Sequence, residues 1–215
     1  RNQKEFIAKN LKINLKVLGI SNSRKMIISD SEIDLKNWSK NLDKSKIIAN
    51  STDFQSKILE LNLRNSLFID NTASDLIPMT YSEYLNNGIG IITCNKIANS
   101  GTLSNYQNLK TLSRNNNCSF LYETNVGAAL PVISTLNNLI NSGDKIIKIE
   151  AVLSGTLNYI FNSFNKIDTF HKIVSKAVDL GYTEPDPKID LCGVDVSRKI
   201  LILARESGYK LEIDD

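Results

Sequence analysis

The sequence has few of the residues from which most metal centres and nucleophilic triads are built. Its three cysteines, Cys94, Cys118 and Cys192, are widely spaced and none lies in a Cys-x-x-Cys pair. This argues against a disulfide framework and a structural zinc site, and is typical of a reducing compartment such as the cytoplasm. The one histidine, His171, has no acid or nucleophile near it in sequence, so acid–base chemistry falls to Lys, Asp, Glu or Tyr.

Long apolar runs and dense blocks of one charge are missing as well. No stretch approaches the roughly 18 apolar residues of a membrane-spanning helix. The 26 basic and 23 acidic residues are intermixed and leave a net charge of +3. This pattern favours a mixed-charge surface over a nucleic-acid or membrane face. With 215 residues, 41% of them hydrophobic, the chain can form one large core or two small ones.

Short apolar segments separated by helical stretches predict a parallel α/β sheet in the first part of the chain. The expected strands are residues 12–20, 66–70, 89–93 and 119–122. Helices are expected over residues 75–87 and in a stretch that ends near Asn116. Ligands of such folds bind at the carboxyl ends of the strands. The Gly-x-Gly-x-x-Gly motif does not occur, so we expect a Rossmann-like sheet that lacks its first strand and glycine loop.

The pattern changes near residue 143, which divides the chain into a predicted partial dinucleotide-binding domain (1–142) and a second domain (143–215). Residues 144–153 are rich in β-branched side chains and predict a strand. Three helices are expected after it, over residues 154–164, 169–180 and 195–206. One strand cannot cover three helices, so we expect an incomplete α+β lobe.

The densest group of charged residues lies in the last fifth of the chain. Asp195 and Lys199, four residues apart on an expected helix, project from the same helix face. The loop before them contains two prolines and carries Glu184 and Asp190. This arrangement suits a small zwitterion, because Glu184 can hold an ammonium group and Lys199 can exchange a proton with a hydroxyl. Spacing alone favours this only slightly over a surface ion pair of about 0.3–0.5 kcal/mol.

Three long blocks carry the most recognisable pattern: residues 122–133 (YETNVGAALPVI), 143–160 (GD, then LSGTLNYI) and 181–199 (GYTEPDPKIDLCGVDVSRK). They resemble the signatures of the homoserine dehydrogenase family. Upstream, DNTAS at 70–74 and TCNK at 93–96 resemble the cofactor-side blocks of that family. Residues 19–25 and 34–38 resemble the form fused behind an aspartate kinase.

The resemblance implies an NAD(P)-dependent interconversion of L-homoserine and L-aspartate 4-semialdehyde in threonine and methionine biosynthesis. Lys199 would be the catalytic proton donor and acceptor, with Asp195 beside it and Lys96 between cofactor and substrate. Glu184 and Asp190 would bind the substrate. The family also implies a homodimer or higher homo-oligomer formed through the second domain.

Cofactor and cation contacts follow from the same resemblance. Arg24, Lys25, Thr72 and Lys96 would contact NADP or NAD, and a cation at Arg24 would favour the 2′-phosphate of NADP. Backbone carbonyls would hold a structural monovalent cation, Na⁺ or K⁺, at Glu123, Val126, Ala128 and Leu130.

Two alternatives stay open. One is an oxidoreductase of similar architecture that acts on another substrate, although the match is concentrated in the substrate-side blocks. The other is a non-catalytic remnant that serves as an interaction or regulatory module. The missing glycine loop favours the remnant, as do Cys94 and Ala129, which stand where the family usually has Pro and Gly. Against it, the five proposed catalytic and substrate residues are all present.

Overall fold

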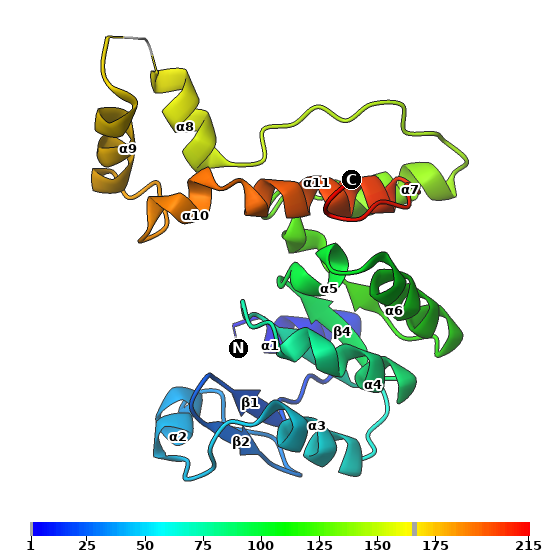
Figure 1. The fold of residues 1–215 in the computed structure, drawn as a ribbon. Coiled ribbons are helices and arrows are strands. Elements are labelled where there is room, and N and C mark those ends of the chain that lie inside the picture. The colour runs from blue at the N-terminus through cyan, green and yellow to red at the C-terminus, as the bar shows by residue number, and fades with distance from the viewer. Residues whose placement is uncertain (1, 165–166) are drawn as a thin grey trace.

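A three-stranded parallel sheet lies at the centre of the first part of the chain (Figure 1). The computed structural model, which describes residues 2–164 and 167–215, gives the strand order β3 (Leu67–Asp70), β4 (Gly90–Thr93), β5 (Phe120–Leu121). Asp70 lies beside Thr93 in the parallel register, so the strands end at one edge of the sheet. The predicted parallel α/β fold is confirmed.

Short helices connect these strands and cover the sheet. They are α3 (Ser51–Glu60), the 3-10 turn η2 (Ile77–Thr80), α4 (Tyr81–Asn86), α5 (Ile97–Ser100) and α6 (Leu103–Asn115). The core between them is built from fully buried side chains such as Tyr81, Leu85, Ile91 and Leu109. Gly88 follows α4 with a φ of 71°, the left-handed conformation expected where a helix stops.

The strand predicted for residues 12–20 is wrong over most of its length. After α1 (Lys4–Phe6) and the π-helix η1 (Ile7–Leu11), only β1 (Gly19–Ser21) is a strand. It pairs antiparallel with β2 (Met26–Ile28) in a separate two-stranded sheet, followed by α2 (Trp38–Lys44). The Val17 and Leu18 carbonyls accept N–H groups from Ile33 and Ser29, so this segment pairs with a nearby loop rather than with the parallel sheet.

The strand predicted for residues 144–153 is also wrong. After η3 (Glu123–Asn125) and α7 (Val132–Asn141), the chain runs as an irregular connection past α11 to α8 (Figure 1). Among the described residues no strand pairs with this connection, and the Ile147 side chain is 94% exposed. A β-branched sequence forms a sheet only where a neighbouring strand takes up its backbone groups.

The helices predicted for the second part are confirmed. They are α8 (Gly155–Ser163), α9 (Phe170–Asp179) and α11 (Val194–Glu206). A fourth helix, α10 (Pro187–Leu191), was not predicted and lies in the segment expected to be a loop, where Pro187 at the first helical position and Asp186 as the N-cap start it. Ser154 and Thr169 cap α8 and α9 with their hydroxyl oxygens. Helices α8 and α9 share a small core of their own, whereas Ile202 and Leu203 of α11 belong to the large core of the first part. Helix α11 therefore packs directly on α5 and α7.

Candidate active site

Three loops meet at the carboxyl edge of the parallel sheet, because β3, β4 and β5 run in the same direction. Thr72 follows β3, and its backbone N–H donates to Asp70 Oδ1 at 2.7 Å. Lys96 follows β4 and is the N-cap residue of α5. The predicted cation loop, residues 123–130, follows β5. The structure thus gathers candidates from separate blocks at the edge where such folds bind ligands.

A buried hydrogen-bond network supports the first two loops. Tyr81 donates to Asp70 Oδ2 at 2.6 Å and contacts Thr93 Oγ1 at 2.8 Å. Asn95 Nδ2 donates to Asp70 Oδ2 at 3.3 Å and to the Ser74 carbonyl at 2.8 Å. Burial, together with the hydrogen bond to the Asp70 carboxylate, raises the pKa of Tyr81 well above its usual value. The sequence analysis missed Tyr81, since nothing in its spacing distinguishes it from an ordinary core residue.

The three predicted catalytic residues lie together. Asp195 bridges two lysines, with Oδ2 2.6 Å from Lys199 Nζ and Oδ1 3.2 Å from Lys96 Nζ. Lys199 Nζ also donates to the Leu153 carbonyl at 2.7 Å. An ammonium has three donors, and the third donor of Lys199 has no partner in the described part of the chain. The spacing predicted that Asp195 and Lys199 share a helix face, and the structure adds their ion pair and Lys96 from another element.

The two lysines control the charge of Asp195. Burial works against its ionised form, but the hydrogen bond from Lys199 and the positive charge of Lys96 outweigh it and lower its pKa below the usual value. The Lys96 and Lys199 side chains are 25% and 19% exposed, so both are partly shielded, whereas Asp195 is 51% exposed. Asp195 is therefore kept ionised, and the cluster is partly desolvated and open to a small polar ligand.

The predicted substrate residues form a second group. Asp190 Oδ2, from α10, accepts the backbone N–H of Glu184 at 2.8 Å, which fixes the loop before this helix, and Glu184 is exposed. Among residues 2–164 and 167–215, no hydrogen bond or ion pair joins either carboxylate to Lys199. Asp190 lies on α10, and Asp195 and Lys199 lie on α11, the next helix along the chain, which contacts α10.

The predicted adenosine-side residues lie at the β1–β2 turn. Asn22 Oδ1 accepts the backbone N–H groups of Arg24 and Lys25, each at 2.8 Å, and holds this turn. The Lys25 ammonium donates to the Asp43 carbonyl at the end of α2, whereas the Arg24 side chain is exposed. Of the two cations, Arg24 is the one presented to solvent.

The predicted cation loop turns through left-handed backbone at Gly127 and Ala128, with φ values of 83° and 52°. A Cβ on Gly127 would lie 2.6 Å from Val132, so glycine is required there. Ala129, where the family usually has glycine, is exposed and lies outside the left-handed region, so its methyl group does not distort the turn.

The carbonyls of this loop differ in what they already bind. The Leu130 carbonyl accepts the N–H of Val132, whereas in the described residues no backbone N–H donates to the carbonyls of Val126 and Ala128. The Glu123 carboxylate is used otherwise: it accepts the N–H groups of Ile133 and Ser134 at the start of α7. The free carbonyls fit a hard cation held by backbone oxygens.

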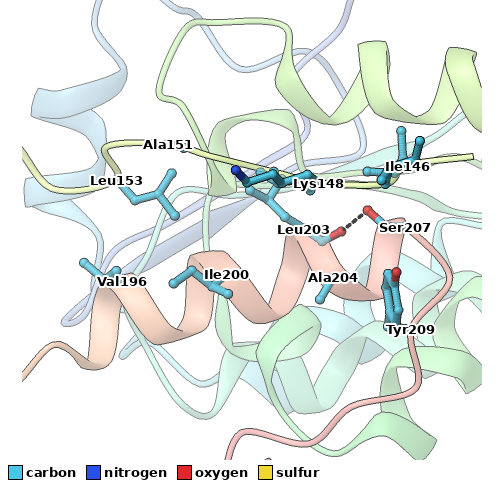
Figure 2. A pocket seen from close by; sticks show the side chains of 12 residues that line it. Ile146, Lys148, Ala151, Leu153, Val196, Ile200, Leu203, Ala204, Ser207 and Tyr209 are labelled. Atoms are coloured by element: carbon cyan, nitrogen blue, oxygen red, sulfur yellow. Dashed lines mark hydrogen bonds between the residues drawn. The ribbon is translucent and has the colours of Figure 1, made fainter.

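A cavity of about 300 Å³ lies elsewhere, between the 144–153 connection and α11 (Figure 2). Its lining is mostly apolar and includes Ile146, Leu153, Val196 and Ile200, and it contains neither Asp195 nor Lys199. The cavity is therefore separate from the charged cluster. Across the described residues, every helix is too short or too polar to cross a membrane.

Comparison with known protein families shows to which family the chain belongs. The model of the homoserine dehydrogenase NAD-binding domain matches residues 2–123, and the homoserine dehydrogenase model matches residues 131–215. The chain belongs to the homoserine dehydrogenase family. The first model spans β1 to β5 with Thr72 and Lys96, and the second spans α7 to α11 with Asp195 and Lys199.

Individual proteins and solved structures resemble most or all of this chain. A chloroplastic bifunctional aspartokinase/homoserine dehydrogenase from Zea mays is 45% identical over 100% of this chain, which spans about a quarter (24%) of that protein. A Candida auris protein of unknown function has a TM-score of 0.84 at 35% identity, covering 96% of this chain and 60% of that one. A hyperthermophilic archaeal homoserine dehydrogenase in complex with NADPH has a TM-score of 0.72 at 26% identity, covering 95% and 65%.

Proposed function

We propose that this chain forms part of a homoserine dehydrogenase, an NAD(P)-dependent oxidoreductase that interconverts L-homoserine and L-aspartate 4-semialdehyde in threonine and methionine biosynthesis. Family membership supports the reaction type. The observation that carries the proposal is the Lys96–Asp195–Lys199 cluster, which joins α11 to the carboxyl edge of the parallel sheet. The match extends through the substrate-side helices, which favours this reaction over other substrates on a similar fold.

The cluster suits the proton transfer of this reaction. Oxidation of homoserine removes a hydride from the carbinol carbon and a proton from its hydroxyl, and bound NADP or NAD supplies the hydride acceptor. In its neutral amine form Lys199 accepts the hydroxyl proton, and Asp195 stabilises the ammonium that results. In the reverse direction Lys199 returns this proton to the aldehyde oxygen. Lys96, on the other oxygen of Asp195, holds the carboxylate in place.

The remaining polar groups serve recognition. Glu184 is exposed and holds the substrate ammonium, while Asp190 fixes the backbone of Glu184. On the cofactor side, Thr72 and Lys96 at adjacent strand ends fit the nicotinamide half, and the exposed Arg24, with Lys25 in the same turn, fits the ribose phosphate of NADP. The relative that was solved with NADPH supports this cofactor.

A monovalent cation bound by the carbonyls of Glu123, Val126, Ala128 and Leu130 would stiffen the loop after β5. The left-handed turn at Gly127 and Ala128 supports this part of the proposal, as do the carbonyls of Val126 and Ala128, to which no backbone N–H of the described residues donates. Such a cation offers no redox chemistry, so its contribution is structural.

For the whole protein we propose a homodimer or higher homo-oligomer that acts on a small-molecule substrate and binds neither nucleic acid nor membrane. The unpaired cysteines support a cytoplasmic location. The relatives from Zea mays are named chloroplastic, so a localisation experiment should compare the cytoplasm with a plastid.

The decisive experiment measures homoserine-dependent reduction of NADP⁺ and NAD⁺ by the full-length protein and its Lys199→Ala variant. We expect kcat to fall about 10²–10⁴-fold in the variant, the usual contribution of a general base, with cofactor affinity unchanged. Lys210→Ala, which removes an exposed lysine beyond α11, is the matched control and should retain activity. A folded, cofactor-binding parent without activity would overturn the proposal and favour the non-catalytic remnant.

A further inference from the structure

The last turn of α11 contains two buried charges that take no part in the proposed chemistry. Arg205 and Glu206 are only 4% and 6% exposed. Burying a charge is costly unless it is fully paired, so a buried arginine next to a buried glutamate indicates a contact with a specific task. Both side chains reach across to the sheet-containing part of the chain.

Arg205 holds the end of α5. Its Nη1 donates to the Asn99 carbonyl at 2.9 Å, while Nε and Nη2 donate to the Leu211 carbonyl and Nη2 pairs with Glu212 at 2.9 Å. Helix α5 ends at Ser100, so the Asn99 carbonyl has no partner within its own helix. Arg205 supplies that partner and is itself held on two sides by Leu211 and Glu212.

Lys96 lies at the opposite end of the same short helix, as its N-cap residue. Helix α11 therefore contacts both ends of α5: Asp195 reaches Lys96, and Arg205 reaches Asn99. A helix of four residues has too few internal hydrogen bonds to hold its own orientation. The Asn99 side chain donates to Asn125 Oδ1 at 2.8 Å, which ties α5 to the loop after β5 but not to α11. The Lys96–Asp195 pair alone is a weak link to α11, because Asp195 is 51% exposed and ion pairs of this kind contribute about 0–1 kcal/mol.

Glu206 fixes the same turn of α11 from the other side. It accepts hydrogen bonds from Tyr106 at 2.5 Å and from Tyr122, and Lys110 Nζ lies 3.3 Å away. These partners come from α6 and from the residue after β5, so α11 is anchored to the same body that carries α5.

We propose that Arg205 is a positioning residue for the homoserine dehydrogenase reaction. Through the Asn99 carbonyl it orients α5, so that Lys96 stays against Asp195 while Lys199 exchanges its proton with the substrate. The inference rests on the proposed function, because it assigns Arg205 a role in the same site. A misplacement of about 1 Å in such a site can cost about 100-fold in rate.

The test compares the full-length protein with its Arg205→Lys variant, which keeps the charge but cannot reach the Asn99 carbonyl, Leu211 and Glu212 together. We expect kcat for homoserine oxidation to fall about 10–100-fold while KM for NADP⁺ stays within about twofold. The kinetic isotope effect on kcat with homoserine deuterated at the carbinol carbon should rise, because the chemical step becomes slower. Arg114→Lys, the same change at an exposed position of α6, is the matched control and should be unaffected.

A second readout does not depend on turnover. Because Lys96 helps to lower the pKa of Asp195, a Lys96 that has moved away should let this pKa rise toward the usual value, which a carboxyl NMR titration measures. If Arg205→Lys does not fold, Glu212→Gln loosens Arg205 from its exposed side and should give the same pattern with a smaller amplitude.

The possible results separate the two proposals. An inactive parent contradicts the proposed function. An active parent whose variants keep kcat, isotope effect and the Asp195 pKa overturns the positioning role. Activity could also fall only in proportion to the amount of folded protein, with the isotope effect and the Asp195 pKa unchanged. Arg205 would then only stabilise the fold, and this result would overturn the positioning role as well.

Discussion

The two ends of α11 carry similar charged side chains in different surroundings. At its start, Asp195 is half exposed and Lys199 retains a donor without a partner in the described residues. At its end, Arg205 and Glu206 are buried, and their polar atoms are used on neighbouring elements. The difference teaches that one helix can separate two tasks. The charges proposed to react stay accessible at one end, and the charges that anchor the helix have their hydrogen bonds satisfied at the other. Each of the following changes tests this separation.

The largest effect is expected from Glu206→Ala. The substitution removes the carboxylate that two buried tyrosine hydroxyls donate to and that pairs with Lys110, and breaking a buried charge network of this kind costs about 3–5 kcal/mol. The free energy of unfolding, measured by urea denaturation, should fall by that amount. Glu123→Ala, which removes a carboxylate that caps α7, should cost only about 1 kcal/mol. An equal loss in both variants would contradict the special role of the buried end.

Asp195→Asn should have the opposite profile. It removes the charge that holds Lys96 and Lys199 together, so kcat for homoserine oxidation should fall about 100-fold. The free energy of unfolding should change by less than about 1 kcal/mol, because the group is half exposed. Asp179→Asn, at an exposed position of α9, is the control for both measurements. If Asp195→Asn instead lowered the free energy of unfolding strongly while kcat per folded molecule stayed unchanged, Asp195 would be an anchoring residue and not a reactive one.

The smallest effect is a difference in pH dependence. Burial disfavours ionised Glu206, but the charge of Lys110 and the hydrogen bonds from Tyr106 and Tyr122 outweigh it and lower its pKa. A group whose folded pKa is lowered stabilises the fold above its unfolded pKa, about 4.3 for Glu, and loses this contribution as the pH falls through the folded pKa.

The free energy of unfolding should therefore fall as the pH drops from 6 toward 3, and Glu206→Gln should flatten that curve. The pKa of Asp195 is lowered as well, so Asp195→Asn should act in the same direction. Its effect should be smaller, since solvent screens a half-exposed carboxylate. Melting temperatures of the two variants over this pH range measure both effects. Identical curves for Glu206→Gln and Asp195→Asn would contradict the distinction between a buried and a half-exposed carboxylate.

Local patterns predicted local structure well. The helices predicted to begin at Ser154 and Thr169 do begin there, with these residues as N-caps, and Gly181, with a φ of 70°, follows the predicted end of the second of them. The four-residue spacing of Asp195 and Lys199 sufficed to predict that both project from one helix face, where they form an ion pair. Such features depend on residues within a turn or two of each other, which the sequence displays directly.

Features that depend on a distant partner could not be predicted in this way. Residues 144–153 have the composition of a strand but no neighbouring strand among the described residues. Glu206 meets Tyr106 and Tyr122 across separations of 100 and 84 residues, and nothing near Glu206 in sequence indicates either partner. Lys96 entered the candidate site through its resemblance to a family block, because its contact with Asp195 exists only in the folded chain.

The backbone acceptor of Lys199 has a consequence for sequence variation. The oxygen that holds this ammonium belongs to the main chain of Leu153, so every amino acid at position 153 offers the same carbonyl. Point substitutions there can alter the apolar cavity that the Leu153 side chain lines, yet they leave the hydrogen bond in place. An insertion or deletion between residues 144 and 153 would move the carbonyl itself. The length of this connection, more than its composition, is therefore what the site requires.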